Sequence, residues 1–352
     1  MLKVGILTFH DEPNYGAFLQ TYGLSEAIKS LGYDVEIIDL RINKAYKYNF
    51  IVKFLSPAIR YFIFETVRKK YLKRTEKIYH SSKELLETPP EFDIYVLGSD
   101  QVWNKDITTE LKYSYFFDFV NDTKTRFSYA SSFGMNEWDF DNAETSTIKR
   151  LLGKFSSIAV RESTAVSLCK NNCNLDTTLV VDPALLISDY SKLTGRIIQK
   201  PKSMVCFKFT KGDSFYNFLR EFKAKNNYKV SILAKTLPVN GLSNIALPTV
   251  GQWIKSIAEA EIVLTDSYHA LIFSIIYKKQ FIVLPANIKN FNRLSELLSD
   301  LNLTDRIFNS YNEVLEDSRW KSKIDYQKVD KLLTTKVDDS LSYLKQQLLL
   351  VD

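Results

Sequence analysis

Short apolar runs alternate along the chain with longer stretches in which apolar residues recur at helical spacing. In the first half the short runs lie at residues 4–8, 35–40, 92–97, 126–131, 157–160 and 179–181. In the second half they lie at residues 203–209, 230–233, 262–264 and 281–284, and helix-spaced stretches include 18–31, 213–224, 252–260 and 326–349. Strands that alternate with helical stretches are typical of an α/β protein with parallel sheets.

The alternation weakens once, between residues 187 and 201, where apolar repeats are sparse and Pro201 closes the stretch. A chain of 352 residues is long for a single core. We therefore expect an N-terminal α/β domain at residues 1–190, a C-terminal α/β domain at 200–325 and a final helix at 326–352.

The first βα unit has a polar loop at residues 10–16, and Gly32 ends the helix that follows it. Glycine is the usual left-handed residue just beyond a helix. The loop does not match G-x-G-x-x-G, and no G-x-x-x-x-G-K-[ST] occurs in the chain. The sequence therefore contains neither a dinucleotide fingerprint nor a P-loop.

Composition changes this interpretation little. Lys and Arg number 47 and Asp and Glu 41, which gives a formal net charge of +6. This mild excess suits anionic substrates or a membrane surface and does not indicate nucleic acid. Cys169, Cys173 and Cys206 form no disulfide framework, no stretch could span a bilayer, and the N-terminus does not resemble a signal peptide. We expect a cytoplasmic protein.

Residues 43–85 differ from the rest, with eleven Lys or Arg against three Asp or Glu, interleaved with aromatic residues. One interpretation is a basic, aromatic face that rests on an anionic membrane. The other is a solvated helical pair with a buried aromatic side. Charge reversal at Arg68, Lys69 and Lys70 would distinguish them.

The most chemically distinctive stretch runs from Glu261 to Pro285. It predicts a strand, a tight turn, a helix that begins near Tyr268, and a second strand. His269, one of three histidines in the chain, then lies in the first turn of that helix. This is the carboxyl end of a parallel strand, where open α/β sheets place their ligands.

Other predicted strands in the first half also end in polar residues. These loops carry Asn14-Tyr15-Gly16, Asp100-Gln101 with Trp103, Arg161-Glu162, and Asp182. Because parallel strands end at one edge of a sheet, these loops are expected to line a cleft.

Seven stretches of the chain form a characteristic series: GILTFHDEPNYGAFLQTYGL (5–24), FDIYVLGSDQVWN (92–104), FSYASSFG (127–134), IAVRE (158–162), VVDPALLI (180–187), TDSYHALIFSIIY (265–277) and RLSELLSDLNLTDRI (293–307). Together, and in this order, they resemble the polysaccharide pyruvyl transferase family. The resemblance implies a GT-B-like fold, in which two Rossmann-like domains face each other across a cleft. It also implies transfer of a pyruvyl group from phosphoenolpyruvate to two saccharide hydroxyls, with formation of a ketal and release of phosphate.

By this resemblance His269 is the general acid, for which histidine is well suited near neutral pH. The alternative is a histidine that packs in the first turn of a helix. Ser267 stands where some members carry Arg, and Ala270 where the most similar branch often has Gly. The helix N-terminus after Ser267 is a plausible anion site, and if Ser267 replaces an Arg, then Arg293 or a lysine such as Lys235 must supply the lost charge.

Two arginines are candidates for binding the donor. Arg161 could clamp its carboxylate or phosphate bidentately, or it could form a structural pair with Glu162 or Asp182. Arg293 is the second candidate.

Acceptor contacts are expected from Asn14, Tyr15, Gly16, Gln101 and Trp103. For the first three residues the alternative is turn chemistry, and for Trp103 it is burial as a loop anchor. Asp100 is a candidate base for a saccharide hydroxyl, and His10 is its rival. Asp139-Phe140-Asp141 matches a D-x-D metal pair only formally, so we expect no metal and no cofactor besides phosphoenolpyruvate as co-substrate.

The first functional hypothesis is therefore a pyruvyl transferase of cell-surface polysaccharide assembly, with a lipid-linked or nucleotide-linked saccharide as acceptor and possible contact with the inner face of the membrane. The second is a GT-B glycosyltransferase that uses a nucleotide sugar. The third is a non-catalytic glycan-binding relative, suggested by Ser267.

Overall fold

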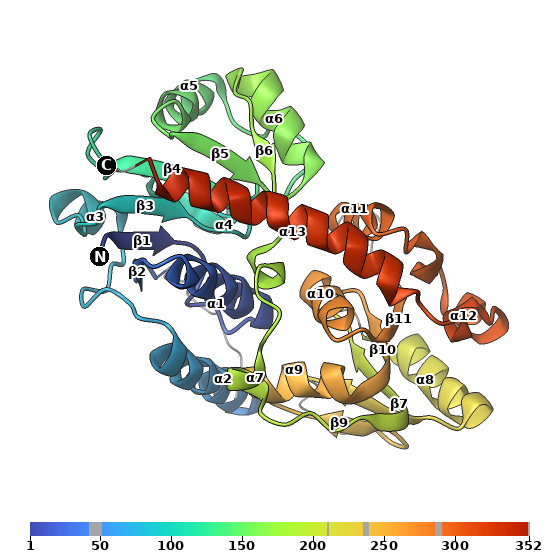
Figure 1. Cartoon of the computed structure of the whole chain (residues 1–352). Helices are drawn as coiled ribbons and strands as arrows, with labels where there is room; N and C mark the ends of the chain where they lie inside the picture. The colour runs from blue at the N-terminus through green and yellow to red at the C-terminus, as the bar shows by residue number, and fades with distance from the viewer. Residues whose placement is uncertain (42–50, 210, 235–238, 286–290, 351–352) are drawn as a thin grey trace. The chain divides into compact units, whose positions relative to one another are not determined.

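The structure, a computed structural model, describes residues 1–41, 51–209, 211–234, 239–285 and 291–350 (Figure 1). The chain divides into two compact units. The first comprises Met1–Ile187 and Thr335–Asp352, and the second comprises Ser188–Thr334. Each contains one parallel sheet with helices between its strands, as the alternation of apolar runs predicts.

The first unit has a six-stranded sheet in the order β2-β1-β3-β4-β5-β6. Its strands are β1 (Lys3–Leu7), β2 (Asp34–Ile37), β3 (Ile94–Leu97), β4 (Thr125–Ser131), β5 (Ser157–Val160) and β6 (Thr178–Leu179). Its helices are α1 (Tyr15–Ser30), α2 (Ile51–Tyr71), α3 (Ser82–Glu87), α4 (Lys105–Thr108), α5 (Asn142–Leu152) and α6 (Ser163–Cys173), with short 3-10 turns η1 (Thr109–Leu111), η2 (Ser114–Phe116) and η3 (Pro183–Leu185).

The second unit has a five-stranded sheet in the order β11-β10-β7-β8-β9. Its strands are β7 (Lys200–Phe207), β8 (Lys229–Leu233), β9 (Ser243–Ile245), β10 (Ala260–Thr265) and β11 (Gln280–Val283). Its helices are α7 (Ser191–Thr194), α8 (Asp213–Asn226), α9 (Val250–Glu259), α10 (Tyr268–Ile276), α11 (Asn292–Asp300) and α12 (Tyr311–Glu316), with 3-10 turns η5 (Thr304–Arg306) and η6 (Arg319–Lys321).

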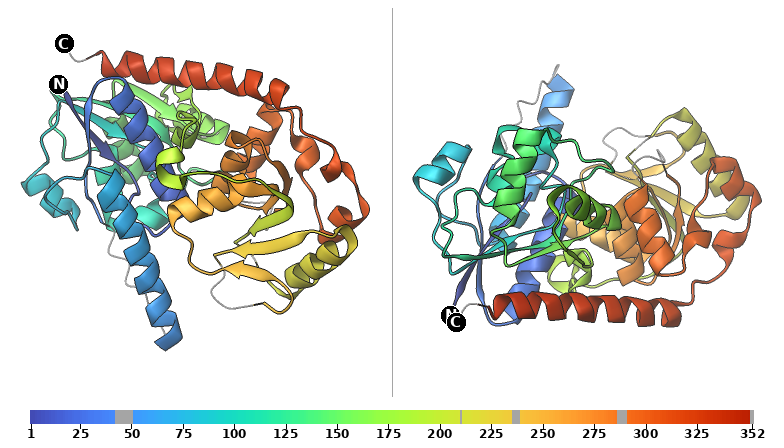
Figure 2. Two further views of the ribbon diagram at one scale, coloured as in Figure 1. Left: turned by 60° about the horizontal axis from the view of Figure 1, so that its bottom comes forward. Right: turned by 90° about the horizontal axis from the view of Figure 1, so that it is seen from above.

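The last helix, α13 (Tyr326–Leu348), begins in the second unit and ends in the first. Figure 2 shows its C-terminal half running along the sheet of the first unit. There the Tyr343 hydroxyl donates to the backbone oxygen of Ser128 at 3.1 Å, and Ser340 accepts from the Val181 N–H at 3.0 Å. These contacts dock the end of the chain onto the first sheet.

Local chemistry explains where the helices begin and end. Asn14 caps α1 by accepting from the N–H groups of Gly16 and Ala17, and Gly32 follows the helix with φ of +93°. This confirms Gly32 as the left-handed residue that ends α1. Thr249 and Gln252 form a capping box at α9.

The central strands are buried on both faces, which is why they read as continuous apolar runs. Ile6, Leu97 and Phe127 in the first sheet are fully buried, as are Cys206 and Leu264 in the second. Each such large apolar side chain contributes roughly 1.5–3 kcal/mol by its removal from water.

The basic segment predicted at residues 43–85 lies partly outside the described residues, and its described part contains α2. Arg68 is fully buried, with its Nε 3.0 Å from Glu65. The expectation that Arg68 belongs to an exposed basic face is therefore wrong, because its Nη1 donates to the backbone oxygens of His10 and Glu12, each at 3.4 Å, in the loop after β1. Lys69, Lys70 and Phe62 are exposed.

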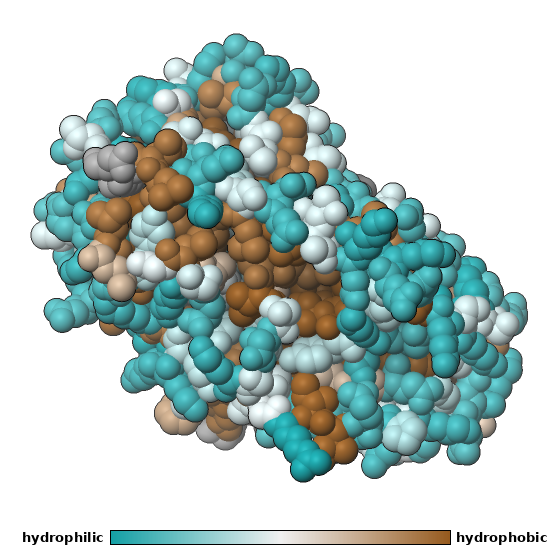
Figure 3. Space-filling model, in the orientation of Figure 1, coloured by the Kyte–Doolittle hydropathy of each residue, from teal (hydrophilic) through white to brown (hydrophobic). Residues whose placement is uncertain are grey.

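Figure 3 shows hydrophilic residues over most of the face in view, with hydrophobic residues in patches between them. In the described part of the chain, no helix combines the length and hydropathy needed to cross a membrane. Cys169, Cys173 and Cys206 are free and buried.

Candidate functional site

The strand order of each sheet has one point where it changes direction. In the first unit this point lies between β1 and β3, and in the second it lies between β7 and β10. Ligands of open α/β sheets bind outside the carboxyl ends of the strands at such points. The loops after these four strands are therefore the candidate site elements.

In the second unit, the turn from β10 into α10 lies at this point and carries His269. The Thr265 hydroxyl donates to the Phe207 backbone oxygen at 2.7 Å, and its Oγ1 accepts from the Ser267 N–H at 2.9 Å. Ser267 is the N-cap of α10, but its side chain makes no capping hydrogen bond. The helix therefore begins at Tyr268 as predicted, with His269 in its first turn.

Lys208 is a charged residue at this corner that sequence reasoning missed. Its side chain is 1% exposed, and its Nζ lies 2.5 Å from the Leu284 backbone oxygen and 3.0 Å from Oδ2 of Asp266. Oδ1 of Asp266 accepts from the N–H of Phe209 at 2.9 Å. A lysine inside the apolar run at residues 203–209 was the available signal, because a lysine rarely lies in a buried strand without a partner.

Arg293, the second candidate for binding the donor, lies at the start of α11. Its guanidinium carbon lies 5.7 Å from the ring centroid of Tyr268, and the Tyr268 and His269 rings are 5.6 Å apart. The Tyr268 ring therefore contacts both Arg293 and His269. Lys235, the other cation proposed for this role, lies outside the described residues.

In the first unit, the loop after β1 leads into α1 and carries Asn14, Tyr15 and Gly16. Asn14 is exposed and caps the helix. Tyr15 is 4% exposed, its ring centroid lies 5.0 Å from that of Phe64, and burial raises its pKa to about 12. The Gly16 N–H donates a hydrogen bond to Oδ1 of Asn14 at 2.8 Å. Direct saccharide contact by Tyr15 or Gly16 is contradicted by this burial, whereas Asn14 stays a candidate.

The loop after β3 begins with Asp100 and Gln101, which are both partly exposed. Asp100 has φ of +83°, a conformation that side-chain-bearing residues seldom adopt and that often accompanies function. Its Oδ1 accepts from the Gln101 N–H at 2.9 Å. Both residues stay candidates.

Trp103, in the same loop, is 1% exposed and stacks on Phe116 with ring centroids 5.6 Å apart. Its indole N–H donates to the Tyr115 backbone oxygen at 3.1 Å. The assignment of Trp103 as an acceptor contact is therefore wrong, because the side chain anchors the loop in the core.

Arg161 follows β5 and is enclosed by acidic side chains. Its Nη1 lies 2.8 Å from Asp182 Oδ2 and donates to Ser99 Oγ at 3.2 Å. Asp100 and Glu162 lie 3.9 and 3.7 Å from other nitrogens of the same guanidinium. These contacts match the structural alternative for Arg161, and they bring Asp100 to the edge of its acidic surroundings.

His10 and Asp39 form a buried hydrogen-bonded pair, with His10 Nε2 3.0 Å from Asp39 Oδ1. Arg41 binds both oxygens of Asp39, at 2.8 and 2.9 Å. Full burial of His10 in this network is at odds with the rival role of His10 as a base for a saccharide.

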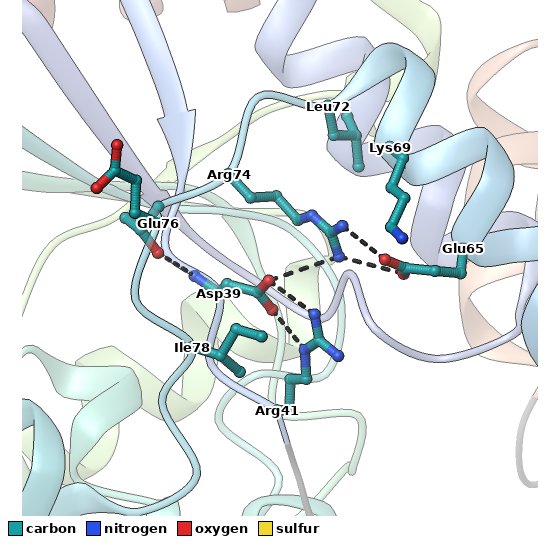
Figure 4. A pocket seen from close by; sticks show the side chains of 9 residues that line it. Asp39, Arg41, Glu65, Lys69, Leu72, Arg74, Glu76 and Ile78 are labelled. Carbon is teal, nitrogen blue, oxygen red and sulfur yellow. Dashed lines mark hydrogen bonds and ion pairs between the residues drawn. The ribbon is translucent and has the colours of Figure 1, made fainter.

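Asp39 and Arg41 also line an open cavity of about 470 Å³ (Figure 4). Arg74 lies in the wall of this cavity, with Nη2 2.7 Å from Oε1 of Glu65 and Nη1 3.5 Å from Oδ2 of Asp39. Both acidic and basic residues line this cavity, and Asp39 and Glu65 pair with its arginines. It therefore lacks the uniformly positive lining that an anionic donor requires.

The residues Asp139, Phe140 and Asp141 have separate structural roles. Asp141 caps α5 in a capping box with Glu144, Phe140 is buried, and Asp139 lies 3.2 Å from Lys105. Across the described ranges, no group of three or more His, Cys, Asp and Glu side chains could hold a metal ion.

Comparison with known proteins identifies one family. The family model described as polysaccharide pyruvyl transferase matches residues 14–287. That span contains the loops after β3 and β10, including Asp100 and His269. No curated protein matches the chain.

Solved structures resemble the chain in fold. The UDP-N-acetylglucosamine 2-epimerase of Rickettsia bellii has a TM-score of 0.58 at 12% identity, covering 98% of this chain and 97% of its own. A putative UDP-N-acetylglucosamine 2-epimerase of Listeria monocytogenes has a TM-score of 0.58 at 9% identity, covering 100% and 98%. UGT89C1 of Arabidopsis thaliana has a TM-score of 0.54 at 10% identity, covering 98% and 99%. The fold is therefore of the GT-B type, as predicted.

Proposed function

Because this chain belongs to the polysaccharide pyruvyl transferase family, we propose that it transfers a pyruvyl group from phosphoenolpyruvate to two hydroxyls of a saccharide. The observation that carries the proposal is the position of His269. It lies in the first turn of α10, directly after β10, where the strand order of the second sheet changes direction.

The proposed reaction needs one acid and a route for two hydroxyl protons. His269 donates a proton to the methylene carbon of phosphoenolpyruvate, which leaves a cationic centre at C2. The first hydroxyl oxygen attacks C2 and loses its proton to a base. The second hydroxyl oxygen then displaces phosphate from C2 and loses its proton to the departing phosphate. The proton held by the base returns to His269 through solvent, and the ketal is complete. No metal or further cofactor takes part in this scheme.

The donor carries a carboxylate and a phosphate, so its site must supply positive charge. The first turn of α10, after Ser267, places backbone N–H groups at the positive end of a helix dipole. Since Ser267 itself carries no charge, we assign the donor's anionic group to this turn together with Arg293. Arg161 is committed to Asp182, so we assign it to supporting Asp100 rather than to the donor.

For the acceptor we retain Asn14, Asp100 and Gln101, which stay at least partly exposed at the carboxyl ends of β1 and β3. Amide and carboxylate groups can hydrogen bond to saccharide hydroxyls. Asp100 is the proposed base, because it is the carboxylate among them and its backbone is held in an unusual conformation. A lipid-linked saccharide is the proposed acceptor.

The experiment is phosphate release from phosphoenolpyruvate in the presence of extracted saccharide acceptors. His269→Ala should lower the rate by about 10²–10⁴-fold, the usual contribution of a general acid. His80→Ala is the matched control, because His80 is exposed and lies outside the loops after β3 and β10 that carry Asp100 and His269. Phosphate release that is absent, or that survives in His269→Ala, would refute the proposal.

A nucleotide-sugar reaction is the second candidate function. A GT-B-type neighbour, MnaA of S. aureus, was solved with UDP, with a TM-score of 0.53 at 10% identity. Thermal stabilisation of this protein by UDP, but not by phosphoenolpyruvate, would favour that candidate. Binding of glycan without turnover of either donor would indicate a non-catalytic relative.

We also propose that α2 rests on the cytoplasmic leaflet of a membrane that carries the acceptor. Ile59, Phe62, Thr66, Lys69 and Lys70 share one exposed helix face. Phe62 is 72% exposed and Ile59 is 47% exposed. An apolar end followed by adjacent lysines suits an interfacial helix on anionic lipid.

A further inference from the structure

Lys208 and Asp266 join the carboxyl ends of three neighbouring strands in the second sheet. The Lys208 ammonium, just after β7, bonds the Leu284 backbone oxygen after β11 and the Asp266 carboxylate after β10. The Asp266 carboxylate also accepts a hydrogen bond from the N–H of Phe209, which follows β7. This closed set of contacts surrounds the point at which the strand order changes direction.

The turn that carries His269 is therefore braced by a buried ion pair. The two side chains are 1% and 4% exposed. Removing one partner of such a pair leaves an uncompensated buried charge, whereas removing both charges together is often tolerated. Asp266 lies three positions before His269, so an uncompensated charge at either partner would act on the imidazole.

We infer that Lys208 and Asp266 are positioning residues for His269. They hold the β10–α10 turn in place, and each compensates the charge of the other beside the turn that carries His269. This inference rests on the proposed role of His269 in proton transfer, but its structural part can be tested without any substrate.

Other charged and titratable groups around this corner stay constant in the test. Among the described residues they include Arg293 on α11, whose guanidinium lies over Tyr268, Tyr311 on α12 and Cys206 on β7. Burial raises the pKa of Tyr311, and the negative charge of Asp266 adds to this effect. Asp266 is thus within electrostatic reach of a neighbouring helix as well as of its own turn.

The first experiment is an NMR titration of the histidine ring protons in the full chain. Only His10, His80 and His269 contribute, and the His269→Ala variant assigns the third signal. Lys208→Met should raise the titration midpoint of His269 by on the order of half a pH unit, because Asp266 then favours the protonated ring. Asp266→Asn should lower the midpoint by a similar amount, and the double variant should return it close to that of the unmodified chain.

Lys278→Met is the matched control. Lys278 lies just beyond the C-terminal end of α10, where it forms an exposed pair with Asp330. Its loss also removes one positive charge from the second unit, but it should leave the His269 midpoint unchanged. If Lys208→Met alone does not fold, Asp266→Asn decides the question, because it removes only the negative charge of the pair and should still lower the midpoint.

The second experiment measures phosphate release against pH for the same variants. The pH optimum should move in opposite directions in Lys208→Met and Asp266→Asn and return in the double variant. A His269 midpoint that does not move in a folded single variant, Lys208→Met or Asp266→Asn, would overturn the inference. Absence of phosphate release by the unmodified chain would instead refute the proposed function, while the NMR result would still decide whether the pair acts on His269.

Discussion

Nε2 of His10 lies 3.0 Å from Oδ1 of Asp39, and Nδ1 of the same ring lies 3.2 Å from the backbone oxygen of Thr8. The His10 ring thereby ties the loop after β1 to Asp39, just beyond β2, and Arg41 hydrogen bonds to both oxygens of the same carboxylate.

The first prediction concerns Asp39. Burial opposes its ionisation, but hydrogen bonds from Arg41 and His10 outweigh that effect and hold its pKa well below the ordinary 3.8. Because the folded-state pKa is the lower one, the stabilisation is full above the unfolded-state value and is lost as the pH falls toward the folded-state value. Asp39→Asn should lower the free energy of unfolding by about 3–5 kcal/mol at pH 7 and by less at pH 3.

Urea unfolding at the two pH values checks this prediction. Asp34→Asn is the control, because Asp34 pairs with Lys73 at the surface and its loss should cost at most about 1 kcal/mol. An equal loss at pH 7 and pH 3 for Asp39→Asn would show that the carboxylate charge is not the stabilising feature.

The second prediction concerns the pair of Arg161 and Asp182. Both side chains are buried, at 1% and 0% exposure, and their closest atoms are 2.8 Å apart. Arg161→Ala and Asp182→Asn should each lower the free energy of unfolding by about 3–5 kcal/mol. The loss in the double variant should be much smaller than the sum of the two single losses, because the residues are in contact. Lys170→Ala tests an exposed pair with Asp176 at the same 2.8 Å and should cost less than about 1 kcal/mol.

A binding role for Arg161 predicts a different pattern. Arg161→Lys would then weaken the interaction with phosphoenolpyruvate while leaving stability nearly unchanged. Calorimetric binding alongside the unfolding measurements distinguishes the two roles.

The third prediction concerns the approach of Gly134 to Gln101. Gly134 has φ of +68°, and a Cβ placed there would lie 2.4 Å from Cδ of Gln101. Gly134→Ala should therefore displace the Gln101 side chain and destabilise the protein by more than the roughly 1 kcal/mol of backbone strain.

Gly241→Ala isolates the backbone part of that cost. Gly241 has φ of +79°, and no atom lies within 4 Å of an added Cβ. If the close contact matters, Gly134→Ala should exceed Gly241→Ala in thermal destabilisation, and the additional Gln101→Ala should restore part of the difference. Equal effects of the two glycine substitutions would contradict the steric explanation.

The order of strands and helices follows from the sequence because buried parallel strands are nearly continuous apolar runs. The predicted helix start near Tyr268 coincides with the observed one, since the polar turn before it leaves few alternatives. The order of strands within each sheet could not be predicted, because periodicity along a chain carries no information about which strands are neighbours.

The candidate site was only partly predictable, for a physical reason that Trp103 and Lys208 illustrate. An aromatic residue in a loop has the same pattern whether it stacks on a ligand or anchors the loop, and Trp103 does the latter. Lys208 stands within an apolar run, and its partner Asp266 is 58 positions away. Only the folded sheet brings the two together.

The last prediction concerns the exposed face of α2 and anionic lipid. Lys69→Glu with Lys70→Glu should reduce cosedimentation with vesicles that contain phosphatidylserine, and added salt should release the unmodified protein, because each surface lysine contributes about 1 kcal/mol there. Phe62→Ser should weaken binding even at high salt, since it removes apolar area instead of charge.

Lys149→Glu with Arg150→Glu is the matched control for that experiment. These are also adjacent basic residues in the last turn of an exposed helix, α5, so they change the net charge by the same amount. Arg68→Glu is unsuitable as a surface probe, because Arg68 is buried against Glu65 and its reversal should unfold the region. If both double reversals weaken vesicle binding equally, attraction by net charge explains the contact, and α2 is not its site.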